Sequence, residues 1–170
     1  MAVVHCLGTG LVGAWVVKRL AAAGHEVHAY DLHPHSVLGV EGVTAHPCDL
    51  FDDMTPFEHN VPVDMVVNML PGSIGHAATT ILAESSFRIV DLSFSAHTPD
   101  RDDEKARDYG ATILWDVGIA PGLSNMLLSI ADRRIGPLQK AEAWVGGNPT
   151  GPFGNWSYMA PFSPIDVIAE

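Results

Sequence analysis

Three glycines near the amino terminus have a spacing that lets a protein backbone approach a phosphate group closely. The motif GxGxxG consists of Gly8, Thr9, Gly10, Leu11, Val12 and Gly13. Gly8 would allow a tight turn, Gly10 would let the backbone come near the phosphates, and Gly13 would let a helix pack closely on a strand. The first amides of that helix, with its dipole behind them, would then bind the phosphates.

An acidic residue follows at the distance expected for the ribose of a dinucleotide. Asp31 lies 18 residues after Gly13, near the usual spacing of about 20. Its carboxylate would accept hydrogen bonds from the adenosine ribose hydroxyls and would repel a 2′-phosphate. After Leu32, which we also assign to the cofactor site, no arginine is present to pair with such a phosphate, although His33 or His35 could supply charge when protonated. The pattern therefore predicts NAD, with NADP less favoured; an S-adenosylmethionine site or a vestigial Rossmann fold are the alternatives.

Further cofactor contacts are expected at the carboxyl ends of the strands, where ligands of open α/β sheets lie. The exit of the fourth predicted strand would run along the dinucleotide, with backbone groups of Asn68, Leu70 and Pro71 in reach of it. Asp49, after the third strand, would meet the adenine edge, although a turn or helix-cap role fits it equally well. Ser93, after the fifth strand, completes the predicted cofactor-binding residues.

Three ionisable side chains are expected where a substrate would meet the nicotinamide. Asp91 ends the fifth predicted strand, His97 lies just beyond it, and Asp116 ends the sixth. Hydride transfer from an amine-bearing carbon requires the nitrogen to lose a proton, so a carboxylate or imidazole here could act as the base or hold an ammonium group. Capping or loop hydrogen bonding is the alternative for each. The histidines and cysteines show no convincing ligand spacing, so no metal site is predicted.

Strand-like runs alternate with helical stretches over the first 118 residues, which predicts a Rossmann-type, doubly wound parallel sheet with helices on both faces. The predicted strands are Ala2–Leu7, Glu26–Asp31, Val43–His46, Val63–Leu70, Arg88–Leu92 and Ala111–Val117, with one more at Leu138–Val145. The predicted helices are Leu11–Ala23, Asp52–His59, Ser73–Ser85, Pro99–Tyr109 and Ser124–Arg134. The acidic residues in the first turns of the fourth helix, where they complement its dipole, are expected to form a solvated face: Asp100, Asp102, Asp103 and Glu104.

Composition and charge exclude several classes of protein. Nine Lys plus Arg against 20 Asp plus Glu give a formal net charge of −11, the wrong sign for binding DNA or RNA through its phosphates. Cys6 and Cys48 have no CxxC spacing and suit a reducing compartment. The apolar stretch Ala2–Val17 is too short to span a bilayer, and no Lys or Arg precedes it as in a secretion signal. We therefore expect a soluble cytoplasmic protein without nucleic-acid or membrane partners.

Several segments resemble the saccharopine dehydrogenase and lysine 6-dehydrogenase family. They are the Gly8–Gly13 motif, the run Asp64–Pro71 and, most specifically, DVGIAPGLSN at Asp116–Asn125. The resemblance continues through Val145–Pro149, an aromatic stretch with Trp156 and Tyr158, and Phe162–Pro164. It covers essentially the whole chain, and lysine 6-dehydrogenase is the more similar of the two.

This resemblance implies a nicotinamide-dependent oxidation of a C–N bond in an amine or amino acid, such as conversion of a lysine ε-amine to a semialdehyde, or the reverse reduction. Family members carry a second α+β domain that closes the substrate site and makes dimer contacts. Residues 1–135 would then be the dinucleotide-binding domain, and residues 136–170 the beginning of the second domain of a homodimer. About 25 residues after Val145 cannot form an independent core, so we expect a fragment or a chain that needs a partner. A non-catalytic NAD(P)-binding regulatory module is the alternative.

Overall fold

The computed structural model describes residues 1–50, 63–94 and 97–144. The chain divides into two compact units, Met1–Trp115 and Asp116–Glu170. Helix α4 (Leu123–Ile135) lies in the second of these units. The domain boundary that the sequence predicts after residue 135 stays a prediction. The helix predicted at Asp52–His59 lies outside the described residues.

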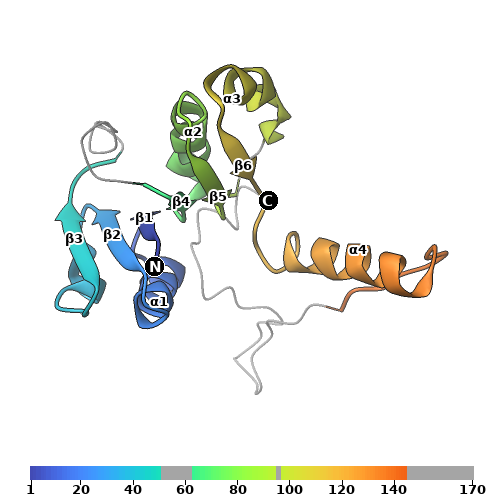
Figure 1. The fold of residues 1–170 in the computed structure, drawn as a ribbon, viewed down its shortest axis with the longest axis horizontal. Helices are drawn as coiled ribbons and strands as arrows, with labels where there is room; N and C mark the ends of the chain where they lie inside the picture. The colour runs from blue at the N-terminus through green and yellow to red at the C-terminus, as the bar shows by residue number, and fades with distance from the viewer. Residues whose placement is uncertain (51–62, 95–96, 145–170) are drawn as a thin grey trace, which may run out of the picture. The chain divides into compact units, whose positions relative to one another are not determined.

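Six parallel strands form one sheet in the first unit, in the order β3-β2-β1-β4-β5-β6 (Figure 1). They are β1 (Val3–Leu7), β2 (Glu26–Asp31), β3 (Val43–Pro47), β4 (Met65–Asn68), β5 (Arg88–Asp91) and β6 (Thr112–Leu114). Because β1 pairs with β2 on one side and β4 on the other, the winding direction reverses there. A ligand site is expected outside the carboxyl ends of β1 and β4, and the predicted Rossmann-type sheet is confirmed.

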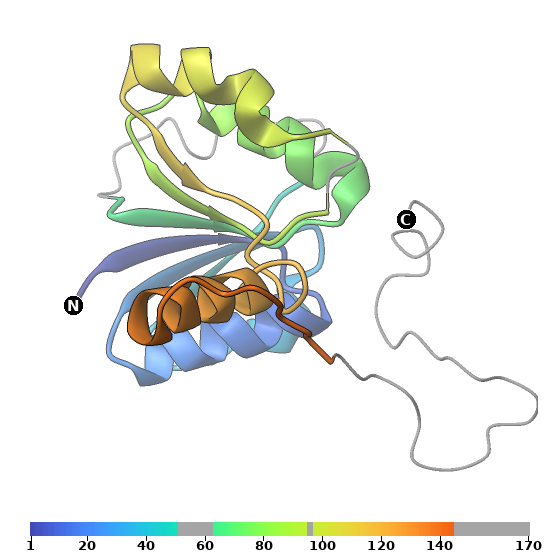
Figure 2. The same ribbon diagram turned by 90° about the vertical axis from the view of Figure 1, so that its right-hand side faces the viewer.

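Helices cover both faces of this sheet, which is why its strands are short apolar runs. Figure 2 shows helix α1 (Leu11–Ala22) on one face and helices α2 (Gly72–Leu82) and α3 (Asp103–Tyr109) on the other. Val17 of α1 packs in the cluster that contains Cys6, whereas Ala78 and Leu82 of α2 pack in the cluster that contains Leu7. Alternate residues of β1 therefore serve opposite cores. No described helix combines the length and apolar character needed to cross a bilayer.

Several elements end at residues other than those predicted. The sequence Pro99–Tyr109 forms a 3-10 turn, η3 (Pro99–Asp102), followed by α3, which ends at Gly110 with φ +81°. A second 3-10 turn, η1 (Pro34–Val37), follows β2. The fourth strand is two residues shorter than predicted at each end. At its carboxyl end, the amide of Leu70 donates to the Asn68 side chain instead of to a neighbouring strand.

The strand predicted at Leu138–Val145 is wrong over its described residues, 138–144, which are irregular. The Leu138 amide donates to Asp132 Oδ1 at 2.8 Å, which ties the start of this stretch back to α4. An isolated strand leaves its backbone groups unpaired, and the sheet of the described residues contains no strand from this segment. Within the second unit, α4 is confirmed within one residue of each predicted end.

Three histidines and a tyrosine stack on one face of β1, β2 and β3. The ring centroids of His5 and His28 lie 4.9 Å apart, and those of Tyr30 and His46 lie 4.5 Å apart. Tyr30 Oη lies 3.2 Å from His5 Nδ1, and a 2.9 Å hydrogen bond joins His28 Nδ1 to His46 Nε2. Burial, together with charge on His28 and His46, lowers the pKa of His5 to about 4. We call these four residues the histidine cluster; the sequence alone assigns them no role.

Candidate functional site

The turn after β1 packs closely at two of the three motif glycines, Gly8 and Gly13, and is open at the third, Gly10. Gly8 has φ +86°, and a Cβ there would lie 2.9 Å from the carbonyl oxygen of Met69. At Gly13 a Cβ would overlap the carbonyl oxygen of Gly8, so only glycine lets α1 pack on the turn. At Gly10, the N-cap of α1, a Cβ would meet no atom within 4 Å. The motif therefore leaves an open backbone surface at the start of a helix, where anions are favoured.

Asp31 lies on the other side of this turn and is held by backbone amides. Its Oδ2 accepts a hydrogen bond from the Thr9 amide at 2.6 Å, and its Oδ1 accepts one from the His33 amide at 2.8 Å. The Ser36 hydroxyl donates to the Thr9 carbonyl oxygen at 2.8 Å. The backbone of Thr9 is thus bonded at both its N–H and its C=O, and the carboxylate stays beside the glycine-rich turn.

Two features of this turn fit a bound dinucleotide. Thr9 is only 4% exposed, and its Oγ1 has no hydrogen-bond partner among the described residues. A buried hydroxyl without a partner costs free energy, and a phosphate or ribose oxygen could accept its proton. The open space at Gly10 admits a pyrophosphate against the backbone. Together with the Asp31 carboxylate, these groups match the phosphates and ribose hydroxyls that a dinucleotide presents.

The other predicted cofactor residues around the turn differ in exposure. Exposed among them are Leu11, Val12, Leu32, Asp49 and Pro71. Leu70 is buried and belongs to the hydrophobic core on the α2 face, so only its backbone could reach a ligand. The side chains of Leu11, Val12 and Leu32 are therefore accessible to a ligand, whereas the side chain of Leu70 packs in the core.

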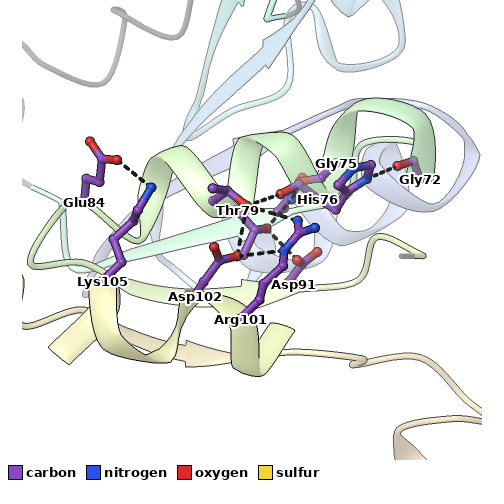
Figure 3. Close-up of polar contacts among 11 residues, drawn as sticks. Gly72, Gly75, His76, Thr79, Glu84, Asp91, Arg101, Asp102 and Lys105 are labelled. Carbon is purple, nitrogen blue, oxygen red and sulfur yellow. Dashed lines mark hydrogen bonds and ion pairs between the residues drawn. The ribbon is translucent and has the colours of Figure 1, made fainter. Parts of the chain in front are cut away.

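Asn68 and Ser93 direct their side chains into the domain. Asn68 is fully buried, and its Nδ2 donates to the Gly75 carbonyl oxygen at 2.8 Å and to Thr79 Oγ1 at 2.9 Å. The Ser93 amide and hydroxyl both donate to Asp91 Oδ1, at 2.7 and 2.6 Å. Thr79 Oγ1 donates to the other Asp91 oxygen at 2.5 Å (Figure 3). For Asn68 and Ser93, backbone groups remain the candidates for contact with a cofactor.

Thr79 was missed by the sequence analysis, although a signal for it exists. It stands with Thr80 in the middle of α2, where β-branched residues are unfavourable for a helix unless their hydroxyls find partners. Thr80 Oγ1 donates to Asp102 Oδ2 at 2.9 Å, and Arg101 contacts both. Asp102 is 5% exposed, so its assignment to a solvated acidic face is wrong; its carboxylate joins η3 to α2.

The three candidate catalytic residues have different surroundings. Asp91 is 4% exposed, and both of its oxygens accept hydrogen bonds from the domain itself. His97 is exposed and lies between the exit of β5 and η3. Asp116 begins the second unit with φ +59°, ahead of a tight loop in which Gly118 and Gly122 form an isolated bridge.

No three His, Cys, Asp or Glu side chains in the described part of the chain are arranged to hold a metal ion. The histidine cluster does not form such a group, because the facing nitrogens of His28 and His46 are hydrogen bonded to each other. In the described residues, then, the side-chain chemistry at the carboxyl edge of the sheet consists of hydroxyls, carboxylates and an imidazole.

No family model matches the chain. In an alignment 139 residues long that covers 78% of this chain, it is 26% identical to the alpha-aminoadipic semialdehyde synthase of Arabidopsis thaliana, of which it spans 13%. The solved structure of aspartate dehydrogenase from Thermotoga maritima superposes with a TM-score of 0.50 at 21% identity, covering 78% of this chain and 52% of that one. The WlbA dehydrogenase from Bordetella pertussis, in complex with NADH and UDP-GlcNAcA, gives a TM-score of 0.56 at 14% identity, covering 78% and 42%. These structural likenesses support the Rossmann-type fold.

Proposed function

We propose that this chain binds NAD(H) at the glycine-rich turn and is the cofactor-binding part of an oxidoreductase that acts on a C–N bond of an amine or amino acid. The observation that carries the cofactor is the turn itself. An open backbone at Gly10, a buried Thr9 hydroxyl with no partner in the described part of the chain and the anchored Asp31 carboxylate meet at the switch point of the sheet. Because Asp31 is anionic beside the expected ribose, we favour NAD over NADP.

The relatives support an amino-acid substrate. The Arabidopsis protein is named for making alpha-aminoadipic semialdehyde, the aldehyde expected when the amine-bearing terminal carbon of lysine is oxidised. The Thermotoga protein is named for a reaction of aspartate. Since the chain spans only part of each protein, the amine remains our proposal. The resemblance to lysine 6-dehydrogenase also supports a homodimer formed through residues beyond the first unit.

Each part of the site would have a distinct task. The helix-start amides and the Thr9 hydroxyl would bind the pyrophosphate, and Asp31 would accept from the ribose hydroxyls. Bound NAD supplies the acceptor for the hydride that leaves the amine-bearing carbon. His97 or Asp116 would take the proton from the nitrogen. We assign Asp91 to positioning rather than proton transfer, because three donors already bind its two oxygens.

Replacing Asp31 with asparagine tests the cofactor assignment. The amide keeps one acceptor oxygen but loses the charge and one acceptor, so NADH affinity should fall by about 10-fold or more. Preference for NADH over NADPH should fall by a similar factor, because repulsion of the 2′-phosphate is lost. Equilibrium titration of both nucleotides measures these changes. Asp108→Asn, the same substitution at an exposed position of α3, is the control.

Unchanged NADH affinity and unchanged cofactor preference in Asp31→Asn would contradict the assignment. Tight binding of S-adenosylmethionine by the wild-type protein, without any response to NADH, would also contradict it. Such results would mean that the glycine-rich turn binds another nucleotide or binds no ligand.

Turnover with amines tests the reaction class. NAD⁺ is mixed with the protein and with lysine, saccharopine or polyamines in turn, and NADH formation is followed by its absorbance. We expect reduction of NAD⁺ with at least one of these amines, by the protein that contains this chain. NADH binding without turnover on any amine would favour the regulatory module instead.

A further inference from the structure

The hydroxyl of Thr79 lies in the middle of a buried chain of hydrogen bonds that joins α2, β4 and β5 (Figure 3). The hydroxyl has one proton, which goes to Asp91, so its oxygen must accept from Asn68 Nδ2. The orientation of the Asn68 amide is set as well, because its Oδ1 accepts from the Leu70 amide at 3.2 Å. Asn68, Thr79 and Asp91 are 0%, 2% and 4% exposed. Every bond in the chain therefore has a defined donor and acceptor.

Each end of this chain of hydrogen bonds fixes the turn that follows one strand. Asn68 ties the turn after β4 through the Leu70 amide, and Asp91 ties the turn after β5 through the amide and hydroxyl of Ser93. A Cβ on Gly75 of α2 would overlap the side chain of Ser93 and come within 3.0 Å of the Leu70 carbonyl oxygen. Helix α2 thus contacts both exits closely, and its Thr79 bonds to both strands.

We propose that Thr79 is a positioning residue that sets the binding site of the nicotinamide ring through these two exits. The inference rests on the proposed function and on the expectation that the dinucleotide runs along the exit of β4, so that its nicotinamide lies beside the exits of β4 and β5. The adenosine half would be held by residues of the β1 turn and β2, including Asp31, whose carboxylate bonds to Thr9 and His33 rather than to Thr79. Loss of the Thr79 hydroxyl should therefore weaken contacts to the nicotinamide ring and spare the rest of the dinucleotide.

The physical reason is the cost of breaking the chain of hydrogen bonds. Without the hydroxyl, an Asn68 N–H and an Asp91 oxygen lose a partner inside the protein, where such groups are costly. The two turns can regain partners only by moving, and they would move at the edge where the nicotinamide is expected. A role limited to stability predicts something different: both halves of the cofactor would be affected equally, or neither would.

The test compares NADH with ADP-ribose, which lacks the nicotinamide, by equilibrium titration of the intact chain. We expect Thr79→Val to weaken NADH binding by about 10-fold, the equivalent of one lost buried hydrogen bond, and to change ADP-ribose binding by less than about twofold. Thr79→Ser keeps the hydroxyl and should restore NADH binding to within about threefold of the wild-type protein. Thr112→Val, the same substitution at an exposed position of β6, should change neither affinity.

Equal losses for NADH and ADP-ribose in Thr79→Val, or no loss for either, would overturn the inference while leaving the proposed function intact. If Thr79→Val does not fold, Asp91→Asn provides the same comparison, because it keeps the shape and removes one acceptor of the chain. Failure of the wild-type protein to bind either ligand would overturn the proposed function, and this inference with it.

Discussion

Replacing Gly13 with alanine is expected to lower the free energy of unfolding by roughly 3 kcal/mol or more and to abolish nucleotide binding. The new Cβ would fall on the carbonyl oxygen of Gly8, a backbone atom that cannot rotate away. Alanine is favoured over glycine inside a helix by only about 1 kcal/mol, which does not offset this overlap. Helix α1 would have to move from the β1 turn, and the anion-binding surface at its start would be lost.

Replacing Gly10 with alanine should weaken NADH binding but leave stability nearly unchanged. A Cβ there meets no atom within 4 Å, and the backbone at φ −63° suits alanine. Stability should therefore change by less than about 1 kcal/mol. NADH binding should still fall by about 10-fold or more, because the methyl group would occupy the space through which the pyrophosphate approaches the backbone.

Urea unfolding and NADH titration of both variants test this pair of expectations. Each variant serves as the control for the other, since the chemical change is the same and the positions are three residues apart. A stable Gly13→Ala protein would show that α1 can shift without cost. Normal NADH binding by Gly10→Ala would place the pyrophosphate elsewhere.

Acid is expected to destabilise the first unit through the histidine cluster. His5 is 1% exposed, and burial, together with charge on His28 and His46, lowers its pKa from 6.5 to about 4. Between these two values the unfolded chain binds a proton that the folded protein does not, so stability is complete above pH 6.5 and is lost as the pH falls towards 4. The expected loss from His5 is roughly 3 kcal/mol over this window.

Most of the charged groups around His5 also lower its pKa. Positive charge on His28 and His46 lowers the pKa of His5, whereas Glu26 raises it. Burial and His28 also lower the pKa of His46. Since His28 and His46 share one hydrogen bond, they cannot both be protonated and keep it. Tyr30, the remaining member of the cluster, faces the Nδ1 of His5 through its hydroxyl.

Urea unfolding across the window from pH 6.5 to pH 4 checks this expectation. His5→Asn can still offer Tyr30 an acceptor while removing the titrating ring, so its stability should depend less steeply on pH even where it is lower overall. His35→Asn, at an exposed position, should keep the wild-type dependence. Identical slopes in His5→Asn and the wild-type protein would show that His5 titrates alike in the folded and unfolded states.

The elements that could be predicted from the sequence are those governed by local rules. Alternation of apolar runs with helical stretches identified the parallel sheet, and the glycine spacing with Asp31 identified the turn at its switch point. These signals are local because a glycine at positive φ, a helix start and a strand each depend on a few consecutive residues. The strand predicted at Leu138–Val145 is wrong because its local pattern is strand-like, whereas a strand also needs a neighbouring strand to pair with.

The partners of polar side chains could not be predicted in this way. Asn68 and Asp91 stand at strand ends, where a ligand contact and an internal hydrogen bond look the same in sequence. Their shared partner is Thr79, on a helix 11 and 12 residues away, and it is found only when α2 packs on the sheet. Likewise, His5 meets Tyr30 across 25 residues because β1 and β2 pair in one register.

By itself, then, the sequence determined the doubly wound sheet and the glycine-rich turn with Asp31 beside it, because backbone conformation and apolar periodicity act over short distances along the chain. Only the tertiary structure decided that Asn68 and Asp91 share Thr79 as a partner inside the domain and that Ser93 donates to Asp91. It also decided that three histidines share one face of the sheet, where His5 and His28 are buried. The reason is physical: the direction and partner of a polar side chain depend on strand register and helix packing, which join residues far apart in the sequence.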